Sequence, residues 1–221
     1  MKILALEFSS PQRSVAVLQA RVDAGPLILG EAVEAGARST NALGLVEAAL
    51  RSAQLDRAQI ECLVVGLGPG SYNGIRLAIA LAQGWQLARP VNLLGISTAE
   101  CLAAEAQAAG MLGRVHVLID AQRGEFYLAS YELSTEAARE IEPLRLATLP
   151  EVQARHQAGG LIIGPEVTNW FPESRVLLPR GATLGRLASG RTDFVPGEKL
   201  EPIYLRATQF VKAPPPRIVP T

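Results

Sequence analysis

The 221-residue sequence contains only two cysteines and two histidines, which limits the chemistry that its side chains can support. Two cysteines are too few for a disulfide scaffold, and this usage is typical of a reducing compartment. Cys62 and Cys101 both lie in apolar segments, so we expect buried thiols rather than a redox or metal pair. His116 and His156 lie far apart and lack the H-E-x-x-H or H-x-x-x-H spacing of a metal site. The sequence therefore predicts no bound metal, and a Ser-His-Asp site meets the same shortage of histidines.

An excess of charge is also absent, because 21 basic and 21 acidic residues give a formal net charge of zero. This balance excludes the overall basic surface of an independent nucleic-acid binder, so contact with RNA would depend on a partner. No uninterrupted apolar run approaches the roughly 20 residues that span a bilayer, and Glu7 comes too early for a signal peptide. We therefore expect no membrane association and a cytoplasmic location. The remaining composition, 48% hydrophobic and 19% charged, is that of an ordinary globular protein.

A glycine-rich turn within residues 60–88 is the clearest candidate for a binding loop. An apolar strand from Leu63 to Val65 is followed by four glycines and one proline within nine residues, and then by a helix. Such a turn can direct backbone N–H groups at an anion near a helix N-terminus. The residues of this candidate phosphate loop, which we regard as vestigial, are Gly68, Gly70, Ser71 and Gly74.

The known nucleotide fingerprints fail in this turn. No lysine follows the glycines, as G-x-x-x-x-G-K-[ST] requires, and the third glycine of G-x-G-x-x-G is replaced by Ser71 or Asn73. The nucleophile elbow G-x-S-x-G fails because Pro69 and Asn73 stand where glycines belong. We therefore favour an architectural role, in which the glycines allow a sharp turn and close packing of the helix on a sheet.

The helix predicted at residues 74–88 is apolar almost all round. Its only polar side chains are Arg76, Gln83 and Gln86. Such a helix must be covered on nearly every side, and the sheet can cover one face only. Together with a helix predicted at residues 40–54, it predicts an interface with another chain, with packing inside the domain alone as the alternative. The predicted interface residues are Leu43, Val46, Leu50, Ile75, Ala78, Ile79 and Ala82.

Two predicted hairpins, about one hundred residues apart, share a layout. The first strand of one ends at Glu7 within residues 3–18, and that of the other ends at Asp120 within residues 115–131. The repetition predicts two related halves, although a hairpin with an acid in its turn is also common by chance. Strands interleaved with helices elsewhere indicate an α/β architecture. The expected division is an N-terminal half at 1–109, a C-terminal half at 110–211 and a proline-rich extended tail at 212–221.

Glu7 and Asp120 are the candidate cleft acids. Carboxylates at two strand ends that face one cleft could hold a hydrated magnesium ion beside a nucleotide phosphate. No lysine or second acid stands near either residue in sequence to complete a phosphotransfer site. We therefore favour two turn acids without a catalytic role, and we regard them as vestigial if the cleft once bound a nucleotide.

Five segments, in order from residue 3 to about residue 206, carry a family signature. They read ILALEFSSPQRSVAVL, GLGPGSYNGIRLAIALAQG, LLGISTAECLAA, IDAQRGEFYLASY and PIYLR. In content and order they resemble the TsaB (YeaZ) family of bacterial proteins. This resemblance implies an actin-like ATPase (ASKHA) fold of two ribonuclease-H-like halves, each a mixed sheet flanked by helices.

The resemblance also implies a function. Members of the family are non-catalytic scaffold subunits that dimerise with their paralogue TsaD in the complex that installs threonylcarbamoyl on adenosine 37 of tRNA. TsaD-type proteins hold a metal through an H-x-x-x-H motif, which is absent here, so the sequence falls in the scaffold branch without a cofactor. The implied partners are TsaD through the two helices, TsaE in addition, a second copy when the protein is alone, and tRNA only through the complex.

Two departures from the family pattern bear on nucleotide binding. Glu7 replaces the usual first-strand aspartate, and Asn73 replaces a threonine of the glycine-rich loop. Both weaken an ATP-handling role. An actin-like phosphotransferase or ATPase that uses Glu7, Asp120 and the glycine-rich loop is the alternative function.

Overall fold

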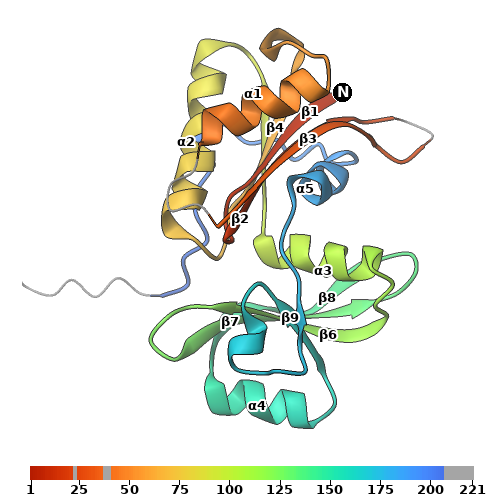
Figure 1. Ribbon diagram of the computed structural model, residues 1–221, viewed down its shortest axis with the longest axis vertical. Helices are drawn as coiled ribbons and strands as arrows, with labels where there is room; N and C mark the ends of the chain where they lie inside the picture. Colours follow the sequence, from red (N-terminus) through yellow and green to blue (C-terminus); the bar gives the residue numbers. More distant parts are fainter. Residues whose placement is uncertain (22–23, 37–40, 207–221) are drawn as a thin grey trace, which may run out of the picture.

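The computed structural model describes residues 1–21, 24–36 and 41–206, which form two halves built on separate five-stranded sheets (Figure 1). The first sheet has the order β3-β2-β1-β4-β5. β1 to β3 are antiparallel, and β4 and β5 run parallel to β1. The strands are β1 (Lys2–Glu7), β2 (Gln12–Gln19), β3 (Leu27–Ala35), β4 (Cys62–Gly66) and β5 (Asn92–Ile96).

Helices cover both faces of the first sheet, so its central strands are buried on both sides. Side chains alternate along β1, so Leu4 and Leu6 face α1 and α2, while Ile3 and Ala5 face α5. These helices span α1 (Ala42–Ser52), α2 (Tyr72–Ala88) and α5 (Gly181–Ala188), and a short 3-10 turn, η1 (Arg57–Gln59), precedes β4.

The second sheet repeats the layout with the order β10-β9-β6-β7-β8. One face packs against α3 and the other against α4. The strands are β6 (Gly113–Asp120), β7 (Glu125–Leu133), β8 (Ala138–Thr148), β9 (Leu161–Gly164) and β10 (Arg175–Val176), and the helices are α3 (Thr98–Ala108), α4 (Leu149–Gln157) and η2 (Val167–Asn169). The last helical turn, η3 (Gly197–Lys199), packs on α2 of the first half.

The two sheets share strand order and strand directions, which confirms the predicted duplication. In both, three antiparallel strands are followed by a helix and by strands that run parallel to the first. This is the α/β arrangement of two ribonuclease-H-like halves that defines the actin-like, or ASKHA-like, fold, as predicted. The largest difference between the halves lies between their last two strands, where the 17-residue helix α2 of the first half corresponds to the 3-10 turn η2 of the second.

The packing does not follow the predicted division at residues 109 and 110. α3 contributes Leu102 and Ala106 to the core of the second sheet, while α5 returns to the first sheet through Leu184 and Ala188. The chain therefore crosses between the halves twice, before α3 and before α5 (Figure 1). The predicted tail at 212–221 lies outside the described residues.

Local capping explains where the two N-terminal helices begin. Asn41 caps α1 by accepting a hydrogen bond from the Gly44 backbone N–H, and Ser71 caps α2 in the same way through Gly74. The predicted helix at 40–54 is thus shorter in the structure, and its other candidate caps, residues 39 and 40, lie outside the described part of the chain. Within that part, no helix combines the length and apolar character needed to cross a bilayer.

The two cysteines are buried free thiols, as predicted from their apolar segments. Both Cys62 and Cys101 are fully buried on the α5 side of the first sheet. Burial raises the pKa of the Cys62 thiol to about 12 and that of Cys101 well above its ordinary value. Neither thiol is therefore a ready nucleophile at neutral pH.

Candidate functional site

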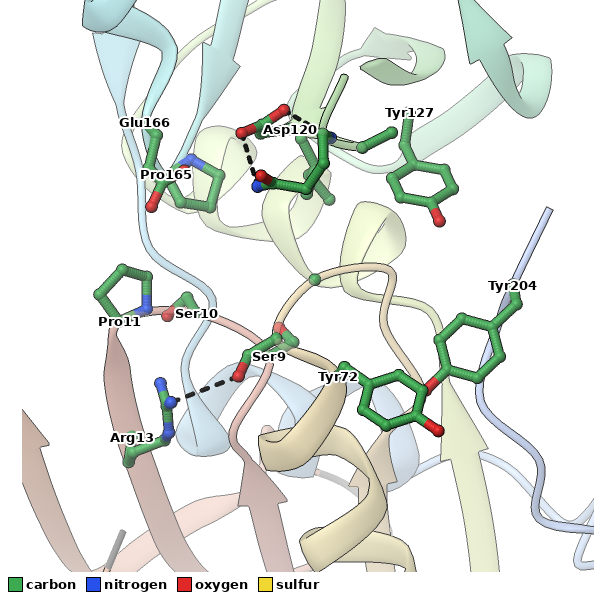
Figure 2. Close-up of a pocket in the computed structure, with 15 residues that line it drawn as sticks. Ser9, Ser10, Pro11, Arg13, Tyr72, Asp120, Tyr127, Pro165, Glu166 and Tyr204 are labelled. Atoms are coloured by element: carbon green, nitrogen blue, oxygen red, sulfur yellow. Dashed lines mark hydrogen bonds between the residues drawn. The ribbon is translucent and has the colours of Figure 1, made fainter. Parts of the chain in front are cut away.

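A cavity of about 500 Å³ lies between the two halves, and Figure 2 shows the side chains around it. Its lower wall comes from the β1–β2 turn and the start of α2, and its upper wall from the β6–β7 turn and the segment after β9 (Figure 2). Most of its polar groups are hydroxyls. The polar and aromatic lining residues are Ser9, Ser10, Arg13, Ser71, Tyr72, Asp120, Gln122, Tyr127, Glu166 and Tyr204.

Glu7 is not a cleft acid, because its side chain is fully buried beneath the cavity and does not line it. One carboxylate oxygen, Oε1, accepts a hydrogen bond of 2.7 Å from the Ser9 backbone N–H. The other, Oε2, has no hydrogen-bond partner within the described part of the chain, and it packs against Gly66. Burial raises the pKa of Glu7, an effect that the Ser9 hydrogen bond and the Arg13 charge only partly offset.

Asp120 does line the cavity, but its carboxylate is occupied by its own turn. Its Oδ1 and Oδ2 accept hydrogen bonds from the backbone N–H and the side-chain Nε2 of Gln122, at 2.7 and 2.8 Å (Figure 2). The structure therefore does not bring Glu7 and Asp120 together as a pair around one ligand. Across the described residues, no cluster of three or more His, Cys, Asp or Glu side chains could hold a metal ion.

The glycine-rich loop packs tightly on the end of β1. The Ser71 N–H, one of the groups that could bind an anion, instead donates to the Ser9 carbonyl at 2.6 Å. A Cβ on Gly74 would lie 2.0 Å from the Phe8 carbonyl oxygen, so no side chain fits there. Gly68 has a φ of +85° and is buried, and only Gly70 and Ser71 of the four predicted loop residues line the cavity. This geometry supports an architectural role for the glycines.

The predicted interface residues lie almost entirely inside the core, which corrects their assignment as surface contacts. Only Leu43, 56% exposed, is available to another chain. The periodic apolar pattern of each helix indicates the side that packs on the sheet, and not a side that faces another protein. The six buried residues are Val46, Leu50, Ile75, Ala78, Ile79 and Ala82.

One face of α2 packs on the sheet, and a second face is covered by a later segment of the same chain. Residues 191–206, here called the strap, run back along the first half after α5. The backbone of Gly197 is held by two glutamines of α2: Gln83 Nε2 donates to its carbonyl at 2.9 Å, and Gln86 Oε1 accepts from its N–H at 2.8 Å. Leu200 of the strap is buried in the same core as α2. The strap was not predicted from the sequence, although two glutamines on an otherwise apolar helix were a signal for it.

One surface of α1 and α2 stays uncovered. Leu87 is 90% exposed near the C-terminal end of α2. We call the exposed aliphatic and glycine positions of these two helices the outer face, and they are Leu43, Ala48, Ala80, Gly84, Leu87 and Ala88. Both helices lie on the same side of the first sheet (Figure 1).

His116 is buried in the second sheet and does not line the cavity. Its Nδ1 lies 2.8 Å from the Ser130 hydroxyl, and Gly160 closes over its other ring nitrogen. Burial lowers the pKa of His116, Arg155 and Arg114 lower it further, and Glu142 opposes them.

This environment predicts a pH-dependent stability. A histidine with a lowered folded-state pKa contributes stability that is present above its unfolded pKa of 6.5 and lost as the pH falls below it. The free energy of unfolding of the wild type relative to His116→Gln should therefore fall by about 1 kcal/mol between about pH 7.5 and pH 5. Urea denaturation at several pH values measures this difference. A pH-independent difference would contradict the prediction.

Comparison with known proteins finds relatives of this chain among the TsaB and TsaD proteins of threonylcarbamoyladenosine biosynthesis. The family model for TsaD, tRNA N6-adenosine threonylcarbamoyltransferase, matches residues 34–173, more than half of the chain. The tRNA threonylcarbamoyladenosine biosynthesis protein TsaB of Escherichia coli is 29% identical over 183 residues, covering 74% of this chain and 78% of that protein. An uncharacterized protein of Mycobacterium tuberculosis is 27% identical over 199 residues, covering 80% and 89%.

The solved structures agree with the sequence relatives. YeaZ from Pseudomonas aeruginosa superposes with a TM-score of 0.76 at 25% identity, covering 92% of this chain and 99% of that one. A second structure from the same organism, described as similar to peptidase YeaZ, gives 0.77 at 26% identity, covering 93% and 99%. The duplicated halves and the cavity between them define an ASKHA-like protein. Within that class, the chain belongs to the TsaB (YeaZ) family, a relative of the TsaD transferases.

Proposed function

We propose that this protein is a non-catalytic subunit in the biosynthesis of threonylcarbamoyladenosine in tRNA, and that it binds and activates a TsaD-type transferase through its outer face. Its relatives carry the first part of this proposal, since those from E. coli and Bacillus subtilis are named for that pathway. The outer face is the observation that supports docking. A 90% exposed leucine beside small residues on one helix allows the close approach of another helix.

The geometry of the cavity argues against the alternative of an ATP-dependent phosphotransferase. That activity would need Glu7 at the cavity wall and free N–H groups on the glycine-rich loop. Glu7 is buried beneath the wall, and the Ser71 N–H is already bonded to Ser9. We therefore assign the transfer chemistry to the partner.

Further partners follow from the same proposal. A TsaE-type ATPase joins the pair, and tRNA is reached only through the assembled complex, because the chain itself carries no net positive charge. The proposed location is the cytoplasm, where tRNA is modified. Without its partner, the outer face can pair with that of a second copy.

Substitution of the two exposed leucines tests the docking proposal. Leu43→Glu and Leu87→Glu place a charge on the outer face without touching the core, so each should weaken binding to the co-expressed TsaD-type protein by about tenfold or more. Isothermal titration of the purified proteins gives the affinity. In parallel, the rate of threonylcarbamoyladenosine formation in tRNA should require both proteins. This rate should be lower with the Leu43 and Leu87 variants, because they bind the TsaD-type protein more weakly.

Leu112→Glu is the matched control, because Leu112 is a similarly exposed leucine, at 57%, in the second half. It should leave affinity and activity unchanged. Equal affinity of the Leu43 and Leu87 variants and the wild type would refute docking on the outer face. Formation of the modified nucleoside by this chain alone would refute the non-catalytic assignment.

A further inference from the structure

The end of the strap is the part of the molecule that connects α2 with the opposite half. The strap is anchored to the first half by backbone hydrogen bonds from Val195 N–H to the Leu93 carbonyl and from Ile203 N–H to the Leu67 carbonyl, both 2.9 Å. Its last described residue, Arg206, then reaches the β6–β7 turn of the second half. The strap thus adds a third connection to the two chain crossings before α3 and α5.

An aromatic stack fixes the strap beside the cavity. Tyr204 stacks on Tyr72, the first residue of α2, with ring centroids 5.4 Å apart (Figure 2). Arg76, one turn further along α2, places its guanidinium 5.2 Å from the Tyr72 ring centroid and donates to the Tyr72 hydroxyl at 3.1 Å. Both tyrosine rings line the cavity and remain partly exposed, so the stack is at its edge rather than in the core.

Arg206 holds the opposite wall of the cavity through two groups of one turn. Its guanidinium pairs with the Glu125 carboxylate and donates to the Gln122 carbonyl at 3.1 Å. Arg206 and Glu125 are both partly exposed, at 32% and 42% of their side-chain surface. An ion pair of this kind is weak and screened by salt, so its contacts are made and broken readily.

The turn that Arg206 holds is strained. Gln122 and Arg123 have φ values of +65° and +61°, in the left-handed region that residues other than glycine avoid, and Gly124 follows at +76°. Such conformations persist only where surrounding contacts hold them. The contacts that hold this turn are the Asp120 carboxylate, two backbone hydrogen bonds that close it, and Arg206. The backbone bonds run from Ala121 N–H to the Glu125 carbonyl at 3.0 Å and from Glu125 N–H to the Gln122 carbonyl at 3.3 Å. Loss of Arg206 would therefore remove the contacts that tie this turn to the strap and would weaken the hold on its strained residues.

We propose that Tyr204 and Arg206 form a releasable latch that sets the width of the cavity between the halves. In the latched state, Tyr204 lies on Tyr72 and Arg206 holds the strained turn, as the structure shows. In the released state, the turn relaxes and the halves pivot about the two chain crossings, which opens the cavity. Because Tyr72 begins α2, a protein bound near this end of the helix can bias the latch.

The distance across the cavity measures the state of the latch. Pro11 and Glu166 are exposed, line opposite walls and lie in opposite halves (Figure 2). Cysteines at these two positions can carry nitroxide spin labels, and the buried native thiols Cys62 and Cys101 stay unlabelled. Pulsed electron paramagnetic resonance on the full chain then gives the distribution of label distances, without any partner.

The latched protein should give one narrow distribution. Arg206→Ala and Tyr204→Ala should each shift it to longer distances by several ångströms and broaden it, and the double variant should add little because both residues belong to one latch. About 1 M sodium chloride should move the wild type in the same direction and leave Arg206→Ala unchanged. Hydrogen exchange of residues 121–125 should rise in the Arg206 variant.

Arg57→Ala provides the matched control, since it removes a surface ion pair, with Glu47, that lies within the first half. It should leave the distribution narrow, and circular dichroism confirms that each variant is folded. Unchanged distance distributions in both Arg206→Ala and Tyr204→Ala would overturn the latch. That result would leave docking on the outer face intact, because the docking test uses other residues and another readout.

Discussion

Gly74→Ala is expected to destabilise the protein by about 3 kcal/mol or more, although alanine is the better helix former. The added Cβ would lie 2.0 Å from the Phe8 carbonyl oxygen and 3.0 Å from its carbonyl carbon. Phe8 is fully buried, so this backbone cannot move aside without disturbing the core between β1 and α2. Urea denaturation followed by circular dichroism measures the loss.

Gly84→Ala is the control for this prediction, because Gly84 lies in the same helix and nothing approaches its Cβ position within 4 Å. That variant should gain about 0.5 to 1 kcal/mol from helix propensity alone. Equal effects of the two substitutions would show that the contact with Phe8 does not restrict residue 74. Close packing would then not be the reason that residue 74 is a glycine.

The second large effect is expected at Glu7, where glutamine should stabilise the protein at neutral and alkaline pH. Glu7 is fully buried, and its raised pKa shows that the folded state disfavours the charged form. The stability that comes from its protonation is present below the unfolded pKa of 4.5 and is lost as the pH rises through the folded pKa. Glutamine keeps the acceptor for the Ser9 N–H and removes the charge.

The gain from Glu7→Gln should therefore be near zero below pH 4.5 and grow to a plateau on the order of 2 kcal/mol above the folded pKa. Urea denaturation of both proteins at a series of pH values shows whether the difference in unfolding free energy grows with pH or is the same at every pH. Glu47→Gln, at an exposed carboxylate paired with Arg57, should change stability by less than about 0.5 kcal/mol throughout. A destabilised Glu7→Gln at pH 8 would contradict the prediction, because it would mean that the folded state favours the charged carboxylate over a neutral side chain.

Much of the fold could be predicted from sequence because its signals are local. The repeated hairpins, the strand at β4 and the apolar helix after it follow from periodicity and turn residues, and the topology confirms the duplication. β8 and α5 were not predicted. β8 is half-exposed and rich in charge, so it lacks a clear alternating pattern. α5 has only eight residues, two of which are glycines that disfavour a helix.

The candidate site was harder to predict because its geometry depends on contacts distant in sequence. Gln83 and Gln86 looked like breaks in an apolar helix, yet they bind Gly197, more than one hundred residues away. For the same reason the apolar stripe of α2 suggested a partner, when the strap already covers one flank. Glu7 ends a strand at the expected position, but only packing decides whether its carboxylate faces the cavity or Gly66.

The replacement of α2 by a single 3-10 turn in the second half has a consequence for assembly size. A duplicated protein with the same helix pair on both halves could bind one neighbour at each end and grow into chains. Here the long helix is present on one half alone. An association through α1 and α2 therefore occupies the first half of the protein. Because the second half has no equivalent helix pair among the described residues, this mode of association ends at two subunits.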